Sequence, residues 1–260
     1  MDKYNMNIKE RLKNKGRVLG VWNSISSPSL SNVIASSGVD FVIIDAEHGP
    51  INMETAEDMV RAVEVGGSVP IIRVPSNEDY LILRALDIGA HGVQIPHISS
   101  AAEADIAVKS ARYYPEGKRG FSPFTRAGNY GKDAERYTDR ANKKTLVVLN
   151  VEGKEGIENV EDIVSISGID VIFIGPYDLS QSLGIPGKVR DKKVLEAIRR
   201  CVKIADKKGI ACGSFACDRE YLNMLIESGV RYLTYMVDTA VIISAYREIY
   251  DFFKAWKKRK

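Results

Sequence analysis

The chain has 260 residues, of which 45% are hydrophobic and 27% charged. This is ordinary globular composition, and it excludes a disordered chain or a collagen-like repeat. The 37 basic and 34 acidic residues leave a net charge of +3, so charge gives no reason to expect a nucleic-acid partner. The length suits one α/β barrel domain of about 200–250 residues.

The first residues of the chain contain no apolar run of the kind that marks a signal peptide. No apolar stretch elsewhere approaches the roughly 20 residues of a membrane span. The three cysteines, Cys201, Cys212 and Cys217, are too few for a disulfide framework, so we expect buried, reduced thiols. These features predict a cytoplasmic protein with no membrane partner.

Short apolar runs alternate with longer amphipathic segments along the whole chain. We expect strands at Val18–Trp22, Phe41–Asp45, Pro70–Val74, Gly92–Pro96, Leu146–Val151, Val171–Gly175, Ala211–Phe215 and Tyr232–Val237. Several of these runs are continuously apolar and do not alternate, which is typical of parallel strands that are covered on both faces.

The segments between these runs show the apolar spacing of helices. We expect helices at Ser29–Ser37, Met53–Val65, Glu78–Ile88, Ala101–Arg112, Val160–Ile166, Lys193–Lys207, Glu220–Glu227 and Ile242–Lys260. Glycines follow several of them in positions typical of a left-handed helix stop: Gly38, Gly66, Gly89, Gly168, Gly209 and Gly229.

The alternation of eight strands with helices predicts a single (β/α)8 TIM barrel domain over residues 1–260. A doubly wound open sheet is the alternative. It is disfavoured because no glycine-rich phosphate loop follows the first strand, where Trp22–Ser26 stands instead.

Two segments exceed what the barrel needs. Residues 113–143 form an excursion far longer than the usual connection of about 2–6 residues, and its aromatics, arginines and glycines are typical of a functional loop. The final helix, residues 242–260, has a large apolar content, so we expect it to close the barrel wall or to pack on another subunit. Its basic end is expected to be a solvated tail that complements the helix dipole, and a nucleic-acid patch is the alternative.

Catalytic groups of a parallel barrel lie at the carboxyl ends of its strands. Glu152 and Asp178 end the fifth and sixth expected strands. Two carboxylates there suit a hard cation such as Mg²⁺ or Mn²⁺, with water completing the coordination shell. A structural ion pair, or a helix cap at Asp178, is the alternative.

The second and third expected strands also end in polar residues. His48 follows Asp45 and Glu47, and a carboxylate can fix the tautomer of an imidazole and make it a base near neutral pH. A structural histidine is the alternative. Arg73 offers a planar donor fork for carboxylate or enolate oxygens, and a salt bridge to a barrel carboxylate is its alternative role.

The other two histidines lie near the fourth strand. His91 precedes that strand, and we expect it to be structural. His97 follows Pro96 at the catalytic end and is a candidate to line the pocket.

At these residues the sequence resembles the HpcH/HpaI aldolase family, the class II, metal-dependent pyruvate aldolases of the phosphoenolpyruvate/pyruvate superfamily. The resemblance runs from Gly20-Val21-Trp22 to the last strand. The order and spacing of the following motifs make it specific: Asp45-Ala46-Glu47-His48-Gly49-Pro50, Arg73-Val74-Pro75, Leu86-Asp87-Ile88-Gly89-Ala90, Tyr114-Pro115-Glu116-Gly117-Lys118-Arg119-Gly120 and Phe173-Ile174-Gly175-Pro176-Tyr177-Asp178-Leu179-Ser180.

The resemblance implies a (β/α)8 barrel that forms a homohexamer, a trimer of dimers with the last helix exchanged between partners. It implies a divalent cofactor (Mg²⁺ or Mn²⁺, with Co²⁺ as a further option) held by Glu152 and Asp178. It also implies a catalytic dyad of His48 and Asp45, and contact of Arg73 with the keto oxygen of the substrate. Supporting or substrate-binding roles follow by the same resemblance: Glu47 at the metal-bound water, Asn150 near the metal ligand, Gly175 and Pro176 at the pyruvate carboxylate, and Asp87 close to a neighbouring subunit's site.

The activity implied is aldol cleavage or condensation of a 4-hydroxy-2-oxo acid, such as a 4-hydroxy-2-oxoheptanedioate or a 2-keto-3-deoxy sugar acid. The products are pyruvate and an aldehyde, formed through a metal-stabilised pyruvate enolate. No expected strand carries an interior lysine, which disfavours a Schiff-base route. Asn150 replaces the glutamine of many relatives, and the loop 125–130 also differs where the aldehyde portion should bind. These differences leave the natural aldehyde open.

Two other readings remain. One is another enzyme of the same superfamily, a citramalyl-CoA-type lyase or a phosphonopyruvate-type hydrolase, which would share the carboxylate-bound metal but lack the dyad. The other is a non-catalytic barrel that binds a keto acid. The joint presence of Asp45, His48, Arg73, Glu152 and Asp178 argues against the second reading.

Overall fold

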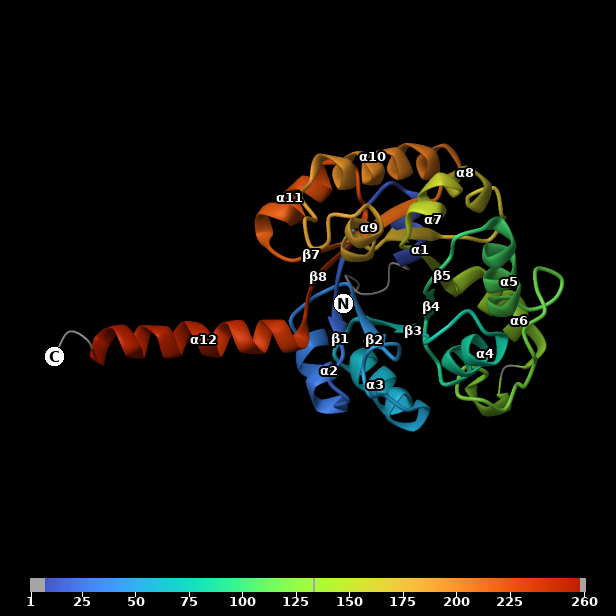
Figure 1. Cartoon of the computed structure of the whole chain (residues 1–260). Coiled ribbons are helices and arrows are strands. Elements are labelled where there is room, and N and C mark those ends of the chain that lie inside the picture. Colours follow the sequence, from blue (N-terminus) through green and yellow to red (C-terminus); the bar gives the residue numbers. More distant parts are fainter. Residues whose placement is uncertain (1–7, 133, 258–260) are drawn as a thin grey trace.

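The computed structural model describes residues 8–132 and 134–257. In this part of the chain, eight parallel strands close into a barrel in chain order, and β8 pairs with β1 (Figure 1). The strands are β1 (Val18–Asn23), β2 (Phe41–Asp45), β3 (Val69–Arg73), β4 (Gly92–Ile95), β5 (Leu146–Val151), β6 (Val171–Ile174), β7 (Ala211–Ala216) and β8 (Tyr232–Val237). The predicted barrel is confirmed, with strand ends displaced by no more than one residue.

Helices surround the barrel. They are α1 (Ile8–Lys13), α2 (Pro28–Ala35), α3 (Met53–Val65), α4 (Asp79–Asp87), α5 (Ala101–Ala111), α6 (Tyr137–Lys144), α7 (Lys154–Glu158), α8 (Val160–Ile163), α9 (Pro176–Ser182), α10 (Lys192–Lys207), α11 (Arg219–Glu227) and α12 (Asp238–Lys257). A side chain caps the start of α2, α3, α5, α10 and α11. The helix predicted at 160–166 is the shorter α8, and the additional short helix α7 precedes it. Asn159 separates them, and its side-chain amide donates to the backbone oxygen of Ser99 at 2.9 Å.

The predicted glycine stops are confirmed at every position except one. Gly38, Gly89, Gly168, Gly209 and Gly229 have positive φ, as expected. The prediction for Gly66 is wrong, because its φ is −71° and Gly67 takes the left-handed conformation. A Cβ at Gly66 would lie 2.4 Å from Cβ of Ala35, so close packing of α3 on α2 requires this glycine.

Aromatic rings that face glycines on neighbouring strands fill the barrel interior. Gly20 is level with Phe41, and a Cβ on it would lie 2.2 Å from that ring. Gly213 stands beside Phe173 and Tyr232 and leaves room for both. The rings of Phe41 and Tyr232 stack with centroids 4.3 Å apart. These rings form a dense apolar floor below the carboxyl ends of the strands.

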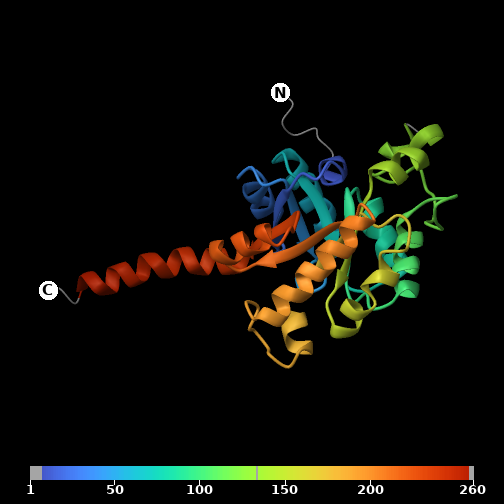
Figure 2. The same cartoon turned by 90° about the horizontal axis from the view of Figure 1, so that it is seen from above.

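Helix α12 leaves the barrel at the end of β8 and projects away from it (Figures 1 and 2). It begins at Asp238, four residues before the predicted start, and the tail 258–260 lies outside the described residues. The Asp238 carboxylate holds the start of the helix against the barrel. It accepts hydrogen bonds from Asn23 Nδ2 at 2.7 Å and from the Ile25 backbone N–H at 2.9 Å. The helix does not cover the barrel wall of its own chain. Its large apolar side chains are exposed: Val241, Ile243, Tyr246, Ile249, Tyr250, Phe252, Phe253 and Trp256.

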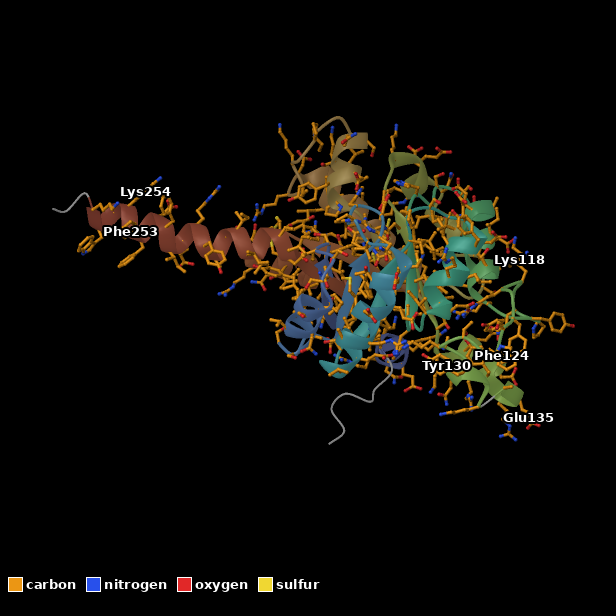
Figure 3. All side chains as sticks on the ribbon, turned by 90° about the horizontal axis from the view of Figure 1, so that it is seen from below. Lys118, Phe124, Tyr130, Glu135, Phe253 and Lys254 are labelled. Atoms are coloured by element: carbon orange, nitrogen blue, oxygen red, sulfur yellow. The ribbon has the colours of Figure 1, made fainter. Side chains whose placement is uncertain are left out.

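The excursion 113–143 lies on the side of the molecule opposite α12. Figure 3 shows Phe124, Tyr130 and Glu135 on that side, far from Phe253. The excursion connects the end of α5 to the start of β5, so it lies at the end of the barrel where the strands begin. The expectation that loop 125–130 lies at the aldehyde part of the site is therefore wrong within one chain.

The remaining expectations concern membranes and thiols. No helix within residues 8–132 and 134–257 is long and apolar enough to cross a membrane. Cys201 and Cys212 are buried, as predicted, and burial raises the pKa of Cys201 to about 12. Cys217 departs from the prediction because it is only partly buried, with Sγ 3.5 Å from Oδ2 of Asp218.

Candidate active site

Two predicted metal ligands come from neighbouring strand ends. Glu152 follows β5, and Asp178 lies in the first turn of α9, directly after β6. Gly175 stands between them: a Cβ there would lie 3.3 Å from Asp178 Oδ2 and 3.8 Å from Glu152 Oε1. Gly175, not Asp178, is the N-cap residue of α9, so the alternative role of Asp178 as a helix cap is excluded.

The electrostatics of this corner favour a cation. Burial raises the pKa of Glu152, and the charges of Asp178 and Glu47 act in the same direction, against a hydrogen bond from Asn150 and the nearby His97. Among the described residues, no three His, Cys, Asp or Glu side chains are arranged to hold a metal ion by themselves. The residues present fit a cation held by two carboxylates, with substrate and water supplying the other oxygen ligands.

Arg73 is fixed at the end of β3 by carboxylates from the end of β2. Its Nε and Nη2 donate to the two oxygens of Asp45 at 2.8 and 2.6 Å, and its Nη1 lies 2.9 Å from Glu47 Oε2. The guanidinium also lies 4.3 Å from the ring centroid of Trp22. This bidentate pairing with Asp45 matches the salt bridge given above as the alternative role of Arg73. Both terminal nitrogens keep N–H groups for a further acceptor.

His48 and Asp45 share one turn after β2. The contact between them is made by the backbone N–H of His48, which donates to Asp45 Oδ1 at 3.3 Å. The His48 imidazole is exposed and makes no hydrogen bond or ion pair within the described part of the chain. The carboxylate of Asp45 is occupied by Arg73, so the two side chains of the predicted dyad are neighbours without direct contact.

His97, which the sequence marked only as a candidate to line the pocket, contacts two carboxylates of this site. Its Nδ1 lies 3.0 Å from Glu152 Oε2 and its Nε2 lies 3.0 Å from Glu47 Oε1, so it joins the two acidic strand ends. Its φ of +58° is unusual for a residue other than glycine, and such strain is common at functional sites. The sequence signal was its place directly after Pro96 at a catalytic strand end. His91 pairs with Glu64 at 2.9 Å at the other end of β4, in agreement with its predicted structural role.

The amide of Asn150 contacts the predicted metal ligand directly. Its Nδ2 donates to Glu152 Oε1 at 2.7 Å, and its Oδ1 accepts from Gln94 Nε2 at 2.8 Å. The shorter side chain at this position therefore reaches Glu152 without a bridging group. Gln94 has no charge and sits in a short apolar strand, which is why the sequence did not mark it.

The remaining predicted residues occupy two different places. Gly175 and Pro176 begin α9, where no side chain caps the first backbone N–H groups. Asp87 ends α4, at the end of the barrel away from the strand carboxyl ends, and its Oδ1 accepts from Arg119 Nη2 at 2.6 Å. One chain therefore does not bring Asp87 to its own candidate active site.

Comparison with known proteins fits this geometry. The chain is 34% identical over 247 residues to 5-keto-4-deoxy-D-glucarate aldolase of Escherichia coli (strain K12), covering 95% of this chain and 96% of that protein. It is also 34% identical to hydroxypyruvate/pyruvate aldolase of Paraburkholderia phytofirmans, covering 93% of this chain and 95% of that protein.

A solved structure of a family member from Burkholderia cenocepacia J2315 is 32% identical, with a TM-score of 0.90 over 95% of this chain and 98% of that one. The model of the family matches the whole barrel, including the polar residues at its strand ends. Residues 18–245 match it, and the chain belongs to the HpcH/HpaI aldolase/citrate lyase family.

Proposed function

We propose that this protein is a carbon–carbon lyase, a class II pyruvate aldolase. It would cleave a 4-hydroxy-2-oxo acid to pyruvate and an aldehyde, and would catalyse the reverse condensation. The observation that carries the proposal is the meeting of Glu152 and Asp178 across the open position at Gly175. The aldolase names of relatives that match nearly the full chain support the reaction class.

Glu152 and Asp178 are the proposed ligands of a divalent cation, with Mg²⁺ or Mn²⁺ favoured because both ligands are carboxylates. A cation bound there would supply positive charge that stabilises an enolate oxygen. Gly175 keeps the space between the ligands open because it has no side chain.

Arg73 is proposed to bind the keto oxygen of the substrate. Asp45 and Glu47 hold its guanidinium before substrate arrives, so no ordering of a flexible side chain is needed in the reaction. A fixed donor aimed at developing negative charge is the usual way in which a protein stabilises an enolate.

His48 is proposed to take the proton from the C4 hydroxyl group of the substrate, directly or through one water. Its imidazole is exposed beside Asp45 and so is accessible to a ligand that enters from solvent. As the hydroxyl proton leaves, the C3–C4 bond breaks, the aldehyde departs, and the electron pair forms the enolate of pyruvate.

Exchange of the pyruvate methyl protons in D₂O tests enolate formation without knowledge of the aldehyde. We expect exchange by purified protein with Mn²⁺ or Mg²⁺, and no exchange after metal removal or in the Glu152→Gln variant. If no divalent metal supports exchange in the unaltered protein, the proposed enolate chemistry is wrong. A coupled assay of pyruvate release over a panel of 4-hydroxy-2-oxo acids then identifies the aldehyde class.

We further propose that the active form is a homo-oligomer, a hexamer built as a trimer of dimers, in which α12 packs on a partner. The exposed apolar face of α12 supports this, since its own barrel does not cover it. The place of Asp87 and loop 125–130 at the far end of the barrel also fits a contribution to a neighbouring subunit's site. In sedimentation experiments, Ile249→Glu with Phe253→Glu should give smaller particles, whereas the matched Glu248→Lys should not. An unaltered protein that sediments as a monomer would contradict the proposal.

A further inference from the structure

A chain of buried polar side chains crosses the barrel interior and ends at Glu152. The Tyr232 hydroxyl donates to Gln94 Oε1 at 3.3 Å, Gln94 Nε2 donates to Asn150 Oδ1 at 2.8 Å, and Asn150 Nδ2 donates to Glu152 Oε1 at 2.7 Å. Tyr232 and Gln94 have no exposed surface, and Asn150 has 1%. The chain therefore links β8, β4 and β5 from below the candidate site.

Every hydrogen bond in this chain has a fixed direction. The carboxylate of Glu152 accepts, so Asn150 must present its amino group to it and keep its oxygen for Gln94. Gln94 must then turn its amino group toward Asn150 and its oxygen toward Tyr232. Burial raises the pKa of Tyr232 well above its usual value, so its hydroxyl stays protonated and remains a donor. Flipping either amide would bring like groups together.

Burying these polar side chains in the barrel core lowers stability wherever a hydrogen bond is not made, so their presence suggests a function. Val148, Ile71 and Phe173 belong to the same apolar core cluster as Tyr232. A buried polar group without its partner costs about 1–3 kcal/mol, so an all-apolar filling at positions 94 and 232 would avoid that risk. What the polar filling provides is a donor held against one oxygen of Glu152, with the other oxygen left to face His97 at 3.0 Å.

We propose that Gln94 and Tyr232 are positioning residues that hold the Asn150 amide against Glu152 and so set the orientation of this cation ligand. The inference rests on the proposed function for the identity of Glu152 as a ligand. Groups that orient a metal ligand from behind are common in metal sites, and their loss lowers metal affinity by about 10–100-fold.

Mn²⁺ titration followed by electron paramagnetic resonance measures the affinity directly, without any turnover. Gln94→Leu should weaken Mn²⁺ binding about 10-fold. Tyr232→Phe removes one oxygen from the far end of the chain and should weaken it less. The matched control is Thr234→Val, on the same strand and equally buried, whose hydroxyl donates to the Ser214 backbone oxygen and not to the chain. It should bind Mn²⁺ as the unaltered protein does.

A double-mutant cycle separates positioning from general loosening of the barrel. If Gln94 acts through Asn150, then Gln94→Leu should have no further effect on Mn²⁺ affinity in an Asn150→Ala background. Equal affinities for the unaltered protein and Gln94→Leu would overturn the proposal. So would the same loss in both backgrounds, since that loss would not pass through Asn150.

A crystal structure of the metal-free Gln94→Leu protein tests the chain independently of the cation. The Asn150 amide should leave Glu152, or the Glu152 carboxylate should take more than one conformation. Unchanged positions of both side chains would overturn the inference. An unaltered protein that binds no Mn²⁺ would contradict the proposed function, while this structure would still decide the role of Gln94.

Discussion

Arg73 and Asp45 join the carboxyl ends of β3 and β2 through two parallel hydrogen bonds of 2.8 and 2.6 Å. This geometry uses the planar fork of arginine, which lysine does not have. The same guanidinium lies over Trp22, so its plane is fixed from a second direction.

Replacement of Arg73 by lysine should therefore lower activity although the positive charge is kept. We expect kcat for pyruvate release to fall about 10²–10³-fold, the usual cost of losing a positioned donor to developing negative charge. The matched control is Arg61→Lys, on the exposed face of α3, where kcat should not change. Equal kcat values for the Arg73→Lys variant and the unaltered protein would remove Arg73 from the reaction.

Loss of the His48 imidazole should separate proton transfer from metal binding. Because the His48 imidazole is exposed and makes no hydrogen bond or ion pair within the described residues, His48→Ala should fold normally. It should bind Mn²⁺ as before and lose turnover about 10²–10⁴-fold, the usual contribution of a general base. His91→Ala is the control, since that histidine pairs with Glu64 at the other end of β4. Unchanged turnover in His48→Ala would show that another group moves the proton.

Repulsion between Glu152 and the nearby carboxylates of Asp178 and Glu47 should lower the stability of the metal-free protein. Glu152→Gln keeps the shape but removes one buried charge near Asp178 and Glu47. We expect its melting temperature without metal to equal or exceed that of the unaltered protein. Added Mn²⁺ at about 100 times the Kd should stabilise the unaltered protein by about 2.7 kcal/mol and leave Glu152→Gln unaffected. Glu155→Gln, an exposed neighbour, should behave like the unaltered protein, and a Mn²⁺ response in Glu152→Gln would argue against the ligand assignment.

Glu64 should make stability sensitive to acid. Burial acts to raise its pKa, but hydrogen bonds from His91 and Arg126 outweigh burial and lower it. A carboxyl group whose pKa is lowered in the folded protein contributes stability above its unfolded pKa of about 4.3, and that stability is lost as the pH falls through the folded value. In urea unfolding experiments, the free energy of unfolding should therefore fall less between pH 6 and pH 3 for Glu64→Gln than for the unaltered protein. The control Glu220→Gln, at an exposed position, should lose as much unfolding free energy over this pH range as the unaltered protein does. The same loss in all three proteins would contradict the prediction.

The sequence predicted those parts of the fold that follow from continuous local patterns. A run such as that of β2, apolar from Phe41 to Ile44, has no other place in a protein of this size than a covered parallel strand. The polar residues directly after such runs, Glu152 and Asp178 among them, could be assigned to one end of the barrel because parallel strands all end there.

Features that depend on contacts between distant segments could not be predicted in this way. Gly66 and Gly67 are adjacent glycines, and the need for a glycine at position 66 comes from Ala35 on a different helix. The contacts of His97 are with Glu47 and Glu152, which follow other strands. Gln94 has no signal in the sequence, because its importance comes from two partners more than 50 residues away, at sequence separations of 56 and 138.

The pairing of Gly20 with Phe41 ties the identity of one position to the size of another. Any side chain at position 20 would occupy the volume of the Phe41 ring, which itself stacks on Tyr232. In related barrels, a larger residue at the first position should therefore accompany a smaller one at the second. Single substitutions on this floor should be strongly disfavoured during evolution, while paired exchanges are tolerated. The barrel floor would then diverge by coordinated steps that change facing residues together.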